Sequence, residues 1–357
     1  MEENKQHKTA LPETEPIPSA QAPEALLDIR DLRVEYHTDE DVVYAVNGLD
    51  LTIGKGESLG LVGETGAGKT TTALSVLRLI ADPPGKIMGG EIWFEGEDML
   101  QAKPARLREI RGSKISVIFQ DPMTSLNPVY SVGDQIAEVI HQHEKCSKEE
   151  GRRKAGDMLE MVGIPRARYD EYPHQFSSGM KQRVVIAMSI ACSPELILAD
   201  EPTTALDVTI QAQVLELMNE LKEKLRTSLL LITHDLGVVA QVCDRVAIMY
   251  AGEIVESGTI AEVFDHPHHP YTIGLFGSIP SLDETAEKLK PIQGQMPDPT
   301  ELPEGCAFAP RCPYATGACR TRKPEMTGVG GTQMVRCLAH QGVFESPELM
   351  EEVRHGR

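Results

Sequence analysis

The sequence predicts an α/β fold built on a mainly parallel sheet, and three observations support this prediction. Five short apolar runs have the length of buried strands; they cover residues 58–63, 114–119, 196–200, 229–233 and 245–250. These runs are continuously apolar, which is typical of strands that are covered on both faces. Stretches with helical spacing separate the runs, and such an alternation of strand and helix favours one parallel sheet with helices around it.

Two further regions are expected to flank this sheet. Residues 26–36 and 45–53 alternate between apolar and polar, and the polar turn HTDED at 37–41 joins them. This pattern predicts an N-terminal antiparallel β region. Residues 121–194 have mainly helical character, so we expect a helical subdomain inserted between two strands of the sheet.

Composition divides the chain into three parts. Residues 1–25 are rich in Pro, Glu and Gln and predict a disordered N-terminal tail without the apolar segment of a signal peptide. Residues 26–274 form the main predicted domain. Residues 275–357 are rich in Pro, Gly and Cys, and they predict a small C-terminal region of a different kind.

Charge and composition argue against two functional classes, nucleic-acid-binding proteins and membrane-spanning proteins. The 357 residues carry a formal charge of −19 and only 4% aromatic residues, which argues against a surface for nucleic acid. No run approaches the roughly 18 consecutive apolar residues that a membrane-spanning helix needs. We therefore expect a cytosolic protein without nucleic acid as a partner. Its seven cysteines are then not expected to form structural disulfides.

A phosphate-binding loop stands between the first apolar run and a helical stretch. It matches the pattern G-x-x-x-x-G-K-[ST] and comprises Gly63, Glu64, Thr65, Gly66, Ala67, Gly68, Lys69 and Thr70, with Thr71 following. The glycines allow backbone N–H groups to converge on phosphate oxygens, and Lys69 can reach the β- and γ-phosphates. The Thr70 hydroxyl can bind Mg²⁺. The motif predicts an ATP site.

Two acids, Asp200 and Glu201, end the apolar run at 196–200. Carboxylates at the carboxyl edge of a parallel sheet are suited to hold a metal ion and a water molecule. We expect Asp200 to bind Mg²⁺ and Glu201 to orient or deprotonate the attacking water. A strand that ends in acids is weak evidence alone; together with the phosphate loop it indicates ATP hydrolysis.

The chain from residue 26 to about 270 resembles the ATPases of ABC transporters, because further motifs of that family occur in its order. The resemblance implies a phosphate-loop NTPase core and assigns a role to each motif. Tyr36 would stack on adenine, with Tyr44 as the second candidate, while Gln120 would contact Mg²⁺ and His234 the γ-phosphate. A structural role in the core remains open for Tyr36.

Two more motifs of the family would act on the ATP site of a second ATPase subunit. They are the signature at 176–180 and the D-loop at 204–207, and their expected site residues are Ser177, Ser178, Gly179, Met180 and Asp207. The family's signature reads L-S-G-G-Q, so Phe176, Ser178 and Met180 depart from it. If the chain needs a positive φ at residue 178, Ser178 would be strained there.

The C-terminal region resembles that of oligopeptide, dipeptide and nickel importer ATPases. The resemblance rests on residues 269–272 (HPYT), 303–313 (PEGCAFAPRCP) and 121–129 (DPMTSLNPV). It implies a peripheral ATPase on the cytoplasmic face of the cell membrane. The implied partners are a second ATPase subunit, with a different chain favoured over an identical one, two membrane permeases and an external substrate-binding protein.

Four cysteines cluster in the C-terminal region, at Cys306, Cys312, Cys319 and Cys337. Four thiolates within about thirty residues suit a four-sulfur metal site. The resemblance implies a [4Fe–4S] cluster; structural Zn²⁺ and metal-free buried thiols remain open.

The expected function is ATP hydrolysis coupled to the import of dipeptides or oligopeptides. Import of nickel or another small solute is the alternative within the same subfamily. A soluble ABC ATPase that acts on nucleic acid or ribosomes is the alternative outside it. The single phosphate loop, the compact helical insertion and the acidic charge disfavour that last class.

Overall fold

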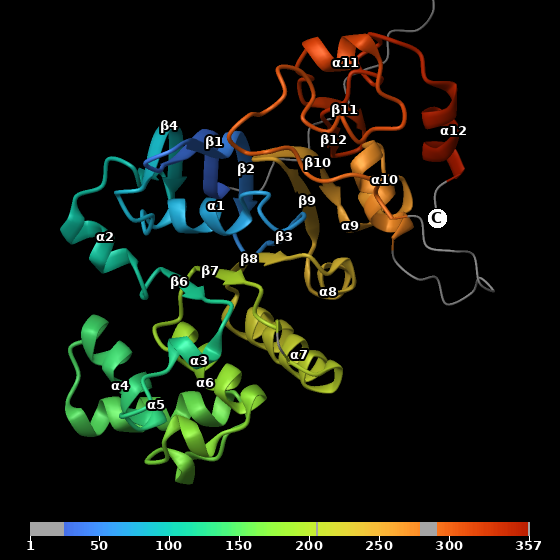
Figure 1. Ribbon diagram of the computed structural model, residues 1–357. Coiled ribbons are helices and arrows are strands. Elements are labelled where there is room, and N and C mark those ends of the chain that lie inside the picture. Colours follow the sequence, from blue (N-terminus) through green and yellow to red (C-terminus); the bar gives the residue numbers. More distant parts are fainter. Residues whose placement is uncertain (1–24, 205, 279–290, 356–357) are drawn as a thin grey trace, which may run out of the picture.

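An eight-stranded sheet forms the centre of the computed structural model, which describes residues 25–204, 206–278 and 291–355 (Figure 1). The strand order is β11-β12-β10-β9-β3-β8-β7-β6. The strands are β3 (Ser58–Val62), β6 (Ile115–Ile118), β7 (Leu196–Asp200), β8 (Ser228–Thr233), β9 (Arg245–Tyr250), β10 (Glu253–Thr259), β11 (Thr327–Gly330) and β12 (Gln333–Val335). The five strands from β9 to β6 are parallel and correspond to the five predicted apolar runs, so the predicted fold class is confirmed.

Strand β8 shows why these runs are continuously apolar. Leu229 and Leu231 belong to the core cluster shared with the helical insertion, whereas Leu230 and Ile232 belong to the cluster shared with the N-terminal sheet. All four side chains are buried, because successive side chains of a strand point to opposite faces and both faces are covered.

A second, antiparallel sheet covers one face of the central sheet and has the order β2-β1-β4-β5. Its strands are β1 (Ala25–His37), β2 (Val42–Gly54), β4 (Gly85–Phe94) and β5 (Glu97–Asp98), with α1 (Lys69–Val76) and α2 (Pro104–Ile110) nearby. The hairpin of β1 and β2 matches the predicted antiparallel region, whereas β4 is not among the predicted strands. The expected tail lies outside the described residues except for Ala25, which begins β1.

Helices α3 to α6 follow β6 and lie together on one side of the molecule (Figure 1). They are α3 (Pro122–Ser125), α4 (Val132–His143), α5 (Lys148–Met161) and α6 (Ser178–Ile190), with 3-10 turns at Arg166–Arg168 and Pro173–Gln175. Ser131, Ser147 and Ser177 cap α4, α5 and α6 by accepting a backbone N–H bond. Residues 121–194, expected to be a helical subdomain, are thus mainly helical.

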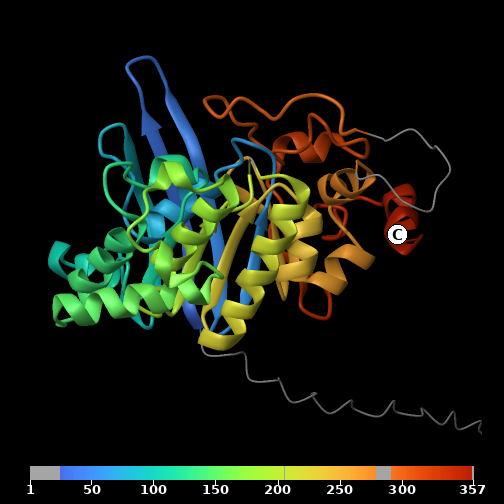
Figure 2. The ribbon, with the colours of Figure 1, turned by 90° about the horizontal axis from the view of Figure 1, so that it is seen from below.

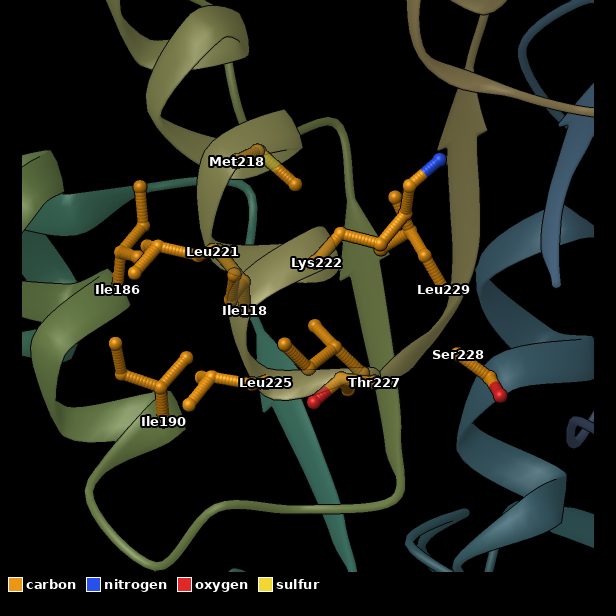
Figure 3. Close-up of a pocket in the computed structure, with 11 residues that line it drawn as sticks. Ile118, Ile186, Ile190, Met218, Leu221, Lys222, Leu225, Thr227, Ser228 and Leu229 are labelled. Atoms are coloured by element: carbon orange, nitrogen blue, oxygen red, sulfur yellow. The ribbon is translucent and has the colours of Figure 1, made fainter. Parts of the chain in front are cut away.

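Helix α7 (Val208–Leu225) packs against α6, and α8 (Leu236–Val242) lies beside β3 and β8. Ile186 and Ile190 of α6 face Leu221 and Leu225 of α7 across a small apolar cavity (Figure 3). Its walls are almost wholly aliphatic, so we interpret it as a packing seam between the helical insertion and the central sheet. Within the described ranges, no helix combines the length and apolar character needed to cross a membrane.

The C-terminal region is joined to the main domain through the central sheet. β12 pairs antiparallel with β10, and β11 pairs with β12, so the two strands extend the central sheet by one hairpin. The remaining helices are α9 (Ile260–Asp265), α10 (Pro270–Gly277), α11 (Gly317–Thr321) and α12 (Pro347–His355). The boundary expected near residue 274 falls inside α10. Figure 2 shows the C-terminal helices beside the strands of the main domain.

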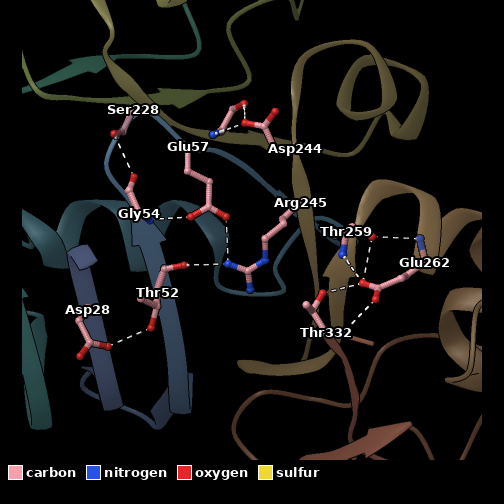
Figure 4. A network of polar contacts seen from close by, with 11 residues as sticks. Asp28, Thr52, Gly54, Glu57, Ser228, Asp244, Arg245, Thr259, Glu262 and Thr332 are labelled. Atoms are coloured by element: carbon pink, nitrogen blue, oxygen red, sulfur yellow. Dashed lines mark hydrogen bonds and ion pairs between the residues drawn. The ribbon is translucent and has the colours of Figure 1, made fainter. Parts of the chain in front are cut away.

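Glu262 ties the C-terminal hairpin to the main domain (Figure 4). Its carboxylate accepts bonds from the backbone N–H groups of Thr332 (2.7 Å) and Thr259 (2.8 Å) and from both threonine hydroxyls (2.6 and 2.9 Å). Burial would raise the pKa of Glu262, but the four donors outweigh burial and lower this pKa to about 2.

Acid is therefore expected to weaken this link. A lowered folded-state pKa stabilises the fold above the unfolded value of 4.5, and this contribution is lost as the pH falls towards 2. Glu262→Gln should lower the free energy of unfolding at pH 7, and its difference from wild type should shrink below pH 4.5. Urea unfolding at pH 7, 5 and 3.5 measures this difference, with Glu149→Gln in the first turn of α5 as the control. A difference that does not change with pH would contradict the expectation.

Candidate functional site

The phosphate loop joins β3 to α1, and its glycines occupy positions that a side chain could not. Gly66 and Gly68 have φ of 86° and 103°. A Cβ on Gly63 would lie 2.2 Å from the carbonyl oxygen of Met249, and one on Gly68 would lie 2.3 Å from that of Ala45. The loop is thus packed against the ends of β9 and β2, and these close approaches require glycine.

Lys69 points back across the loop. Its Nζ donates to the carbonyl oxygens of Gly63 (2.7 Å) and Glu64 (3.0 Å), and the residue is 6% exposed. Burial lowers the pKa of Lys69, while the nearby carboxylates of Glu201 and Asp200 oppose this shift. The ammonium is therefore held in the hollow of the loop, where it can meet a phosphate group.

Glu201 is the meeting point of three polar side chains from separate loops. It accepts bonds from Gln120 Nε2 (2.9 Å) and Thr204 Oγ1 (2.9 Å), and its Oε1 lies 3.2 Å from His234 Nδ1. Its φ of 46° is uncommon for a residue with a side chain, and such strain is typical of functional sites. Burial would raise the pKa of Glu201, but the bonds with His234 and Thr204 lower it overall. The carboxylate is therefore ionised at neutral pH, as a general base must be.

Asp200 is buried beside the phosphate loop. Burial raises its pKa, although a bond with the Thr70 side chain and the charge of Lys69 oppose this. The structure thus brings Thr70, Asp200 and the Gln120–Glu201 pair to one edge of the sheet. Mg²⁺ in nucleotide sites uses only one or two protein ligands besides phosphates and water, and these oxygen donors fit that need.

Tyr36 lies beside helix α1, and its hydroxyl is 3.3 Å from Thr71 Oγ1. The ring is half-buried and faces Gly85 of β4, where a Cβ would lie 2.8 Å from it. Tyr44, the other candidate, is 38% exposed. Tyr36 is thus placed next to the phosphate loop, although its stacking on adenine stays a prediction.

The signature begins helix α6 without strain. Ser178 is the first residue of the helix and is not among the residues with positive φ, so the strain considered for Ser178 is absent. Gly179 packs closely against α7, since a Cβ there would lie 2.3 Å from the Ile210 Cγ2 methyl group and that side chain would have to shift. Asp207 of the D-loop caps α7 by accepting from the Ile210 N–H (3.0 Å).

Arg168 supports the altered signature, and sequence reasoning missed this residue. Its guanidinium carbon lies 4.2 Å from the centre of the Phe176 ring, and its Nη1 is 3.3 Å from the Met180 sulfur. It also donates to the Gln175 carbonyl (3.2 Å). Both side chains that replace the family's Leu and Gln therefore contact one arginine.

Arg311 of the C-terminal region and Tyr271 of α10 contact the phosphate loop, and both contacts were also missed. Arg311 forms an ion pair with Glu64 (3.0 Å), and the Tyr271 hydroxyl accepts from the Glu64 N–H (3.0 Å). These partners are separated by 247 and 207 residues, so no local pattern could have indicated them.

The four cysteines Cys306, Cys312, Cys319 and Cys337 line one apolar cavity together with Phe308, His269 and other residues. Burial raises the pKa of Cys306 to about 11 and that of Cys312 to about 12. Yet no three His, Cys, Asp or Glu side chains in the described ranges are placed to hold a metal ion. The structure thus gathers the predicted cysteines around one cavity but does not support the predicted metal site.

Comparison with known proteins agrees with this geometry. The family described as "ABC transporter" matches residues 46–204, and the "Oligopeptide/dipeptide transporter, C-terminal region" matches residues 255–319. The second match begins within β10, well before the boundary expected near residue 274.

The similarity to individual proteins extends over most of the chain. The chain is 51% identical over 332 residues to the oligopeptide transport ATP-binding protein OppD of Bacillus subtilis (strain 168), covering 91% of this chain and 93% of that protein. It is 48% identical over 316 residues to the dipeptide transport ATP-binding protein DppD of the same organism, and this match covers 88% of this chain and 94% of that protein.

Solved structures share the fold of the main domain. The ATP-binding cassette MJ0796, in a dimeric post-hydrolysis state bound to ADP and Pi, has a TM-score of 0.59 and 27% identity over 66% of this chain and 98% of that chain. The structure of cbiO1 from Clostridium perfringens has a TM-score of 0.58 and 27% sequence identity, and the match covers 67% of this chain and 90% of that chain. With its full-length relatives, the phosphate loop and the Glu201 cluster, the chain belongs to the ABC transporter ATP-binding proteins of the oligopeptide and dipeptide type, and it is an ATPase.

Proposed function

We propose that this ATPase couples ATP hydrolysis to the uptake of dipeptides or oligopeptides through separate permease subunits. The observation that carries the proposal is the combination of a hydrolytic site with the C-terminal region of peptide transporters. The names of the relatives, which are oligopeptide and dipeptide transport proteins, support the same substrate class.

Uptake in a reconstituted system tests the proposal. The chain, its permeases and the external binding protein would be placed in liposomes loaded with MgATP, and entry of labelled di- and tripeptides would be followed. Peptide entry that requires ATP is expected. Entry of Ni²⁺ without peptide entry would favour the nickel alternative, and co-purification with nucleic acid without permeases would favour a soluble ATPase.

In the hydrolytic step, the protein would act mainly by positioning the attacking water and by neutralising charge on the phosphates. Glu201 would take a proton from the water that attacks the γ-phosphorus, and His234 and Gln120 would hold Glu201 and the water in place. Lys69 would neutralise charge on the phosphate oxygens. Thr70, Asp200 and Gln120 would hold Mg²⁺, which supplies further neutralisation of the phosphates when bound.

A second ATPase subunit would complete the site. The similarity to a cassette whose structure is dimeric supports a head-to-tail pair in which the signature meets the ATP of the other subunit. Ser177, Ser178, Gly179 and Met180 would face that ATP, with Asp207 nearby. The altered signature favours a pair of two different chains.

Arg168→Gln tests this role of the signature. The loss of the contacts with Phe176 and Met180 should loosen the signature, and we expect about a tenfold lower ATPase rate in the assembled transporter. ATP affinity of the isolated chain should not change, because Arg168 lies outside the phosphate loop. Arg153→Gln, which removes an exposed ion pair of α5, is the control. Reduced ATP affinity in the isolated chain would contradict this assignment.

The permeases would dock beside the helical insertion. An apolar hollow of about 670 Å³ lies there, and its wall includes Leu79, Phe119, Val139, Val185 and Met188. Phe119 is 46% exposed and directly precedes Gln120, so a permease segment in the hollow would contact the chain next to the hydrolytic cluster. This arrangement supports a peripheral location on the cytoplasmic face of the membrane.

A [4Fe–4S] cluster bound by Cys306, Cys312, Cys319 and Cys337 is a further part of the proposal. Four thiols around one apolar cavity supply the right donors, but the cavity would have to rearrange to bring them onto a cluster. Anaerobically purified protein should then absorb near 400 nm and contain about four irons per chain. A colourless protein with one zinc per chain would instead favour the zinc alternative, and a metal-free protein would favour buried thiols.

A further inference from the structure

Arg311 of the C-terminal region reaches the phosphate loop and is buried there. Its Nη1 donates to both carboxylate oxygens of Glu64 (3.0 and 3.1 Å), and its side chain is only 5% exposed. Its Nε donates to the Gln293 carbonyl (3.1 Å). The catalytic chemistry derived above does not use this arginine.

Arg311 lies against a cluster of aromatic side chains. Tyr250, Tyr271 and Phe308 form a packed aromatic cluster with ring centres 4.6 to 5.5 Å apart. The Tyr250 hydroxyl accepts from Arg311 (3.4 Å), and the Tyr271 hydroxyl accepts from the Glu64 N–H. One residue of the phosphate loop is therefore held from both its backbone and its side chain by the C-terminal half of the chain.

Charge gives this contact a specific consequence for ATP. A carboxylate in the phosphate loop repels the triphosphate, and Arg311 neutralises the Glu64 carboxylate, whose side chain is 32% exposed. Without the arginine, Glu64 would bring an uncompensated negative charge to the loop. With both charges removed, the repulsion would be absent again.

The same turn that carries Arg311 also lines the four-cysteine cavity. The N–H groups of Arg311 and Cys312 both donate to the Phe308 carbonyl (3.0 Å each), and Phe308, Cys306 and Cys312 line the cavity. The backbone from which Arg311 reaches the loop is therefore continuous with the wall of the cavity.

We propose that Arg311 is a positioning residue that keeps the phosphate loop competent to bind ATP by neutralising Glu64, and that the packing of the four-cysteine cavity controls the position of Arg311. The proposal concerns ATP binding by the chain itself. It is therefore independent of which solute the transporter carries.

Two variants of the full chain, one single and one double, test the ion pair by titration with MgATP. Arg311→Gln should raise the Kd for ATP about tenfold, because Glu64 is left unpaired in the loop. Glu64→Gln combined with Arg311→Gln should return the Kd to within about twofold of wild type. A purely structural role of Arg311 would not show this recovery, so a double variant as weak as Arg311→Gln overturns the proposal. An unchanged Kd in Arg311→Gln also overturns it.

Two further variants show whether a weaker affinity for ATP in Arg311→Gln comes from loss of charge or from loss of folding. Arg311→Lys keeps the charge and should bind ATP within about threefold of wild type; a tenfold loss there would assign the effect to packing and overturn the proposal. Arg152→Gln, which breaks the ion pair with Asp170 on the helical insertion, is the matched control and should leave the Kd unchanged.

Cys312→Ala tests the link to the cavity. The variant should raise the Kd for ATP about threefold in the wild-type background and should have no further effect when Glu64 and Arg311 are both replaced by Gln. An equal effect in both backgrounds, or none in wild type, would overturn the role of the cavity and leave the ion pair to be judged by its own variants.

Discussion

Glu201→Gln is expected to abolish ATP turnover while ATP binding persists. The amide can still accept from Thr204 and lie beside His234, so the cluster should keep its shape. It cannot accept a proton from water, and removal of a general base costs about 10²–10⁴ in rate. The ATPase rate of the assembled transporter should therefore fall at least about 100-fold, with the Kd for ATP within about threefold of wild type.

Glu195→Gln is the matched control for this experiment. Glu195 directly precedes the same strand, β7, but stands at its opposite end, where it pairs with Lys114. The same substitution there should leave the ATPase rate unchanged. A Glu201→Gln variant that hydrolyses ATP like wild type would remove Glu201 from the role of base, whereas loss of ATP binding would assign it a role in holding the nucleotide.

Gly68→Ala should have the largest effect on the architecture of the site. A residue other than glycine at φ 103° costs about 1–2 kcal/mol from backbone conformation alone. In addition, the new Cβ would lie 2.3 Å from the Ala45 carbonyl oxygen and 2.8 Å from Met249 Cε. The loop must move away from β2 to relieve this contact. We expect a loss of about 3 kcal/mol or more in the free energy of unfolding and no measurable ATP binding.

Gly56→Ala separates the cost of the backbone conformation from the cost of the steric contact. Gly56 also has a positive φ of 72°, but nothing lies within 4 Å of a Cβ at that position. Urea unfolding of this variant should show only the backbone cost, about 1 kcal/mol, with unchanged ATP binding. If both variants lost the same amount of stability, the contact with Ala45 would not be what requires glycine in the phosphate loop.

The regular part of the fold could be predicted because its signals are local. Each parallel strand is a short run of consecutive apolar residues, and β8 shows why: its side chains alternate between two cores and are all buried. β4 was missed because Gly89 and Gly90 interrupt its apolar pattern. β11 and β12 were missed because they are short and join the sheet only through distant pairing, β12 with β10 and β11 with β12.

Some residues of the candidate site could be predicted and others could not, because only some of them carry a local signal. The phosphate loop is a contiguous motif, and Gln120, Glu201 and His234 each follow an apolar strand, so parallel strands bring them to one edge. Arg168 carries no such signal, and the motif at 303–313 that contains Arg311 gave no sign of a contact with the phosphate loop. Each acts through partners that only folding brings near, such as Phe176 for Arg168 and Glu64 for Arg311.

By itself, the sequence determined the α/β class, the phosphate loop and the order of the ATPase motifs, because these depend on neighbouring residues and on strand direction. Only the tertiary structure decided that Ser178 fits the helix without strain, that Glu201 is the shared partner of Gln120, Thr204 and His234, and that the C-terminal region contacts the phosphate loop. These are properties of distances between segments far apart in the chain. No local pattern of residue types contains those distances.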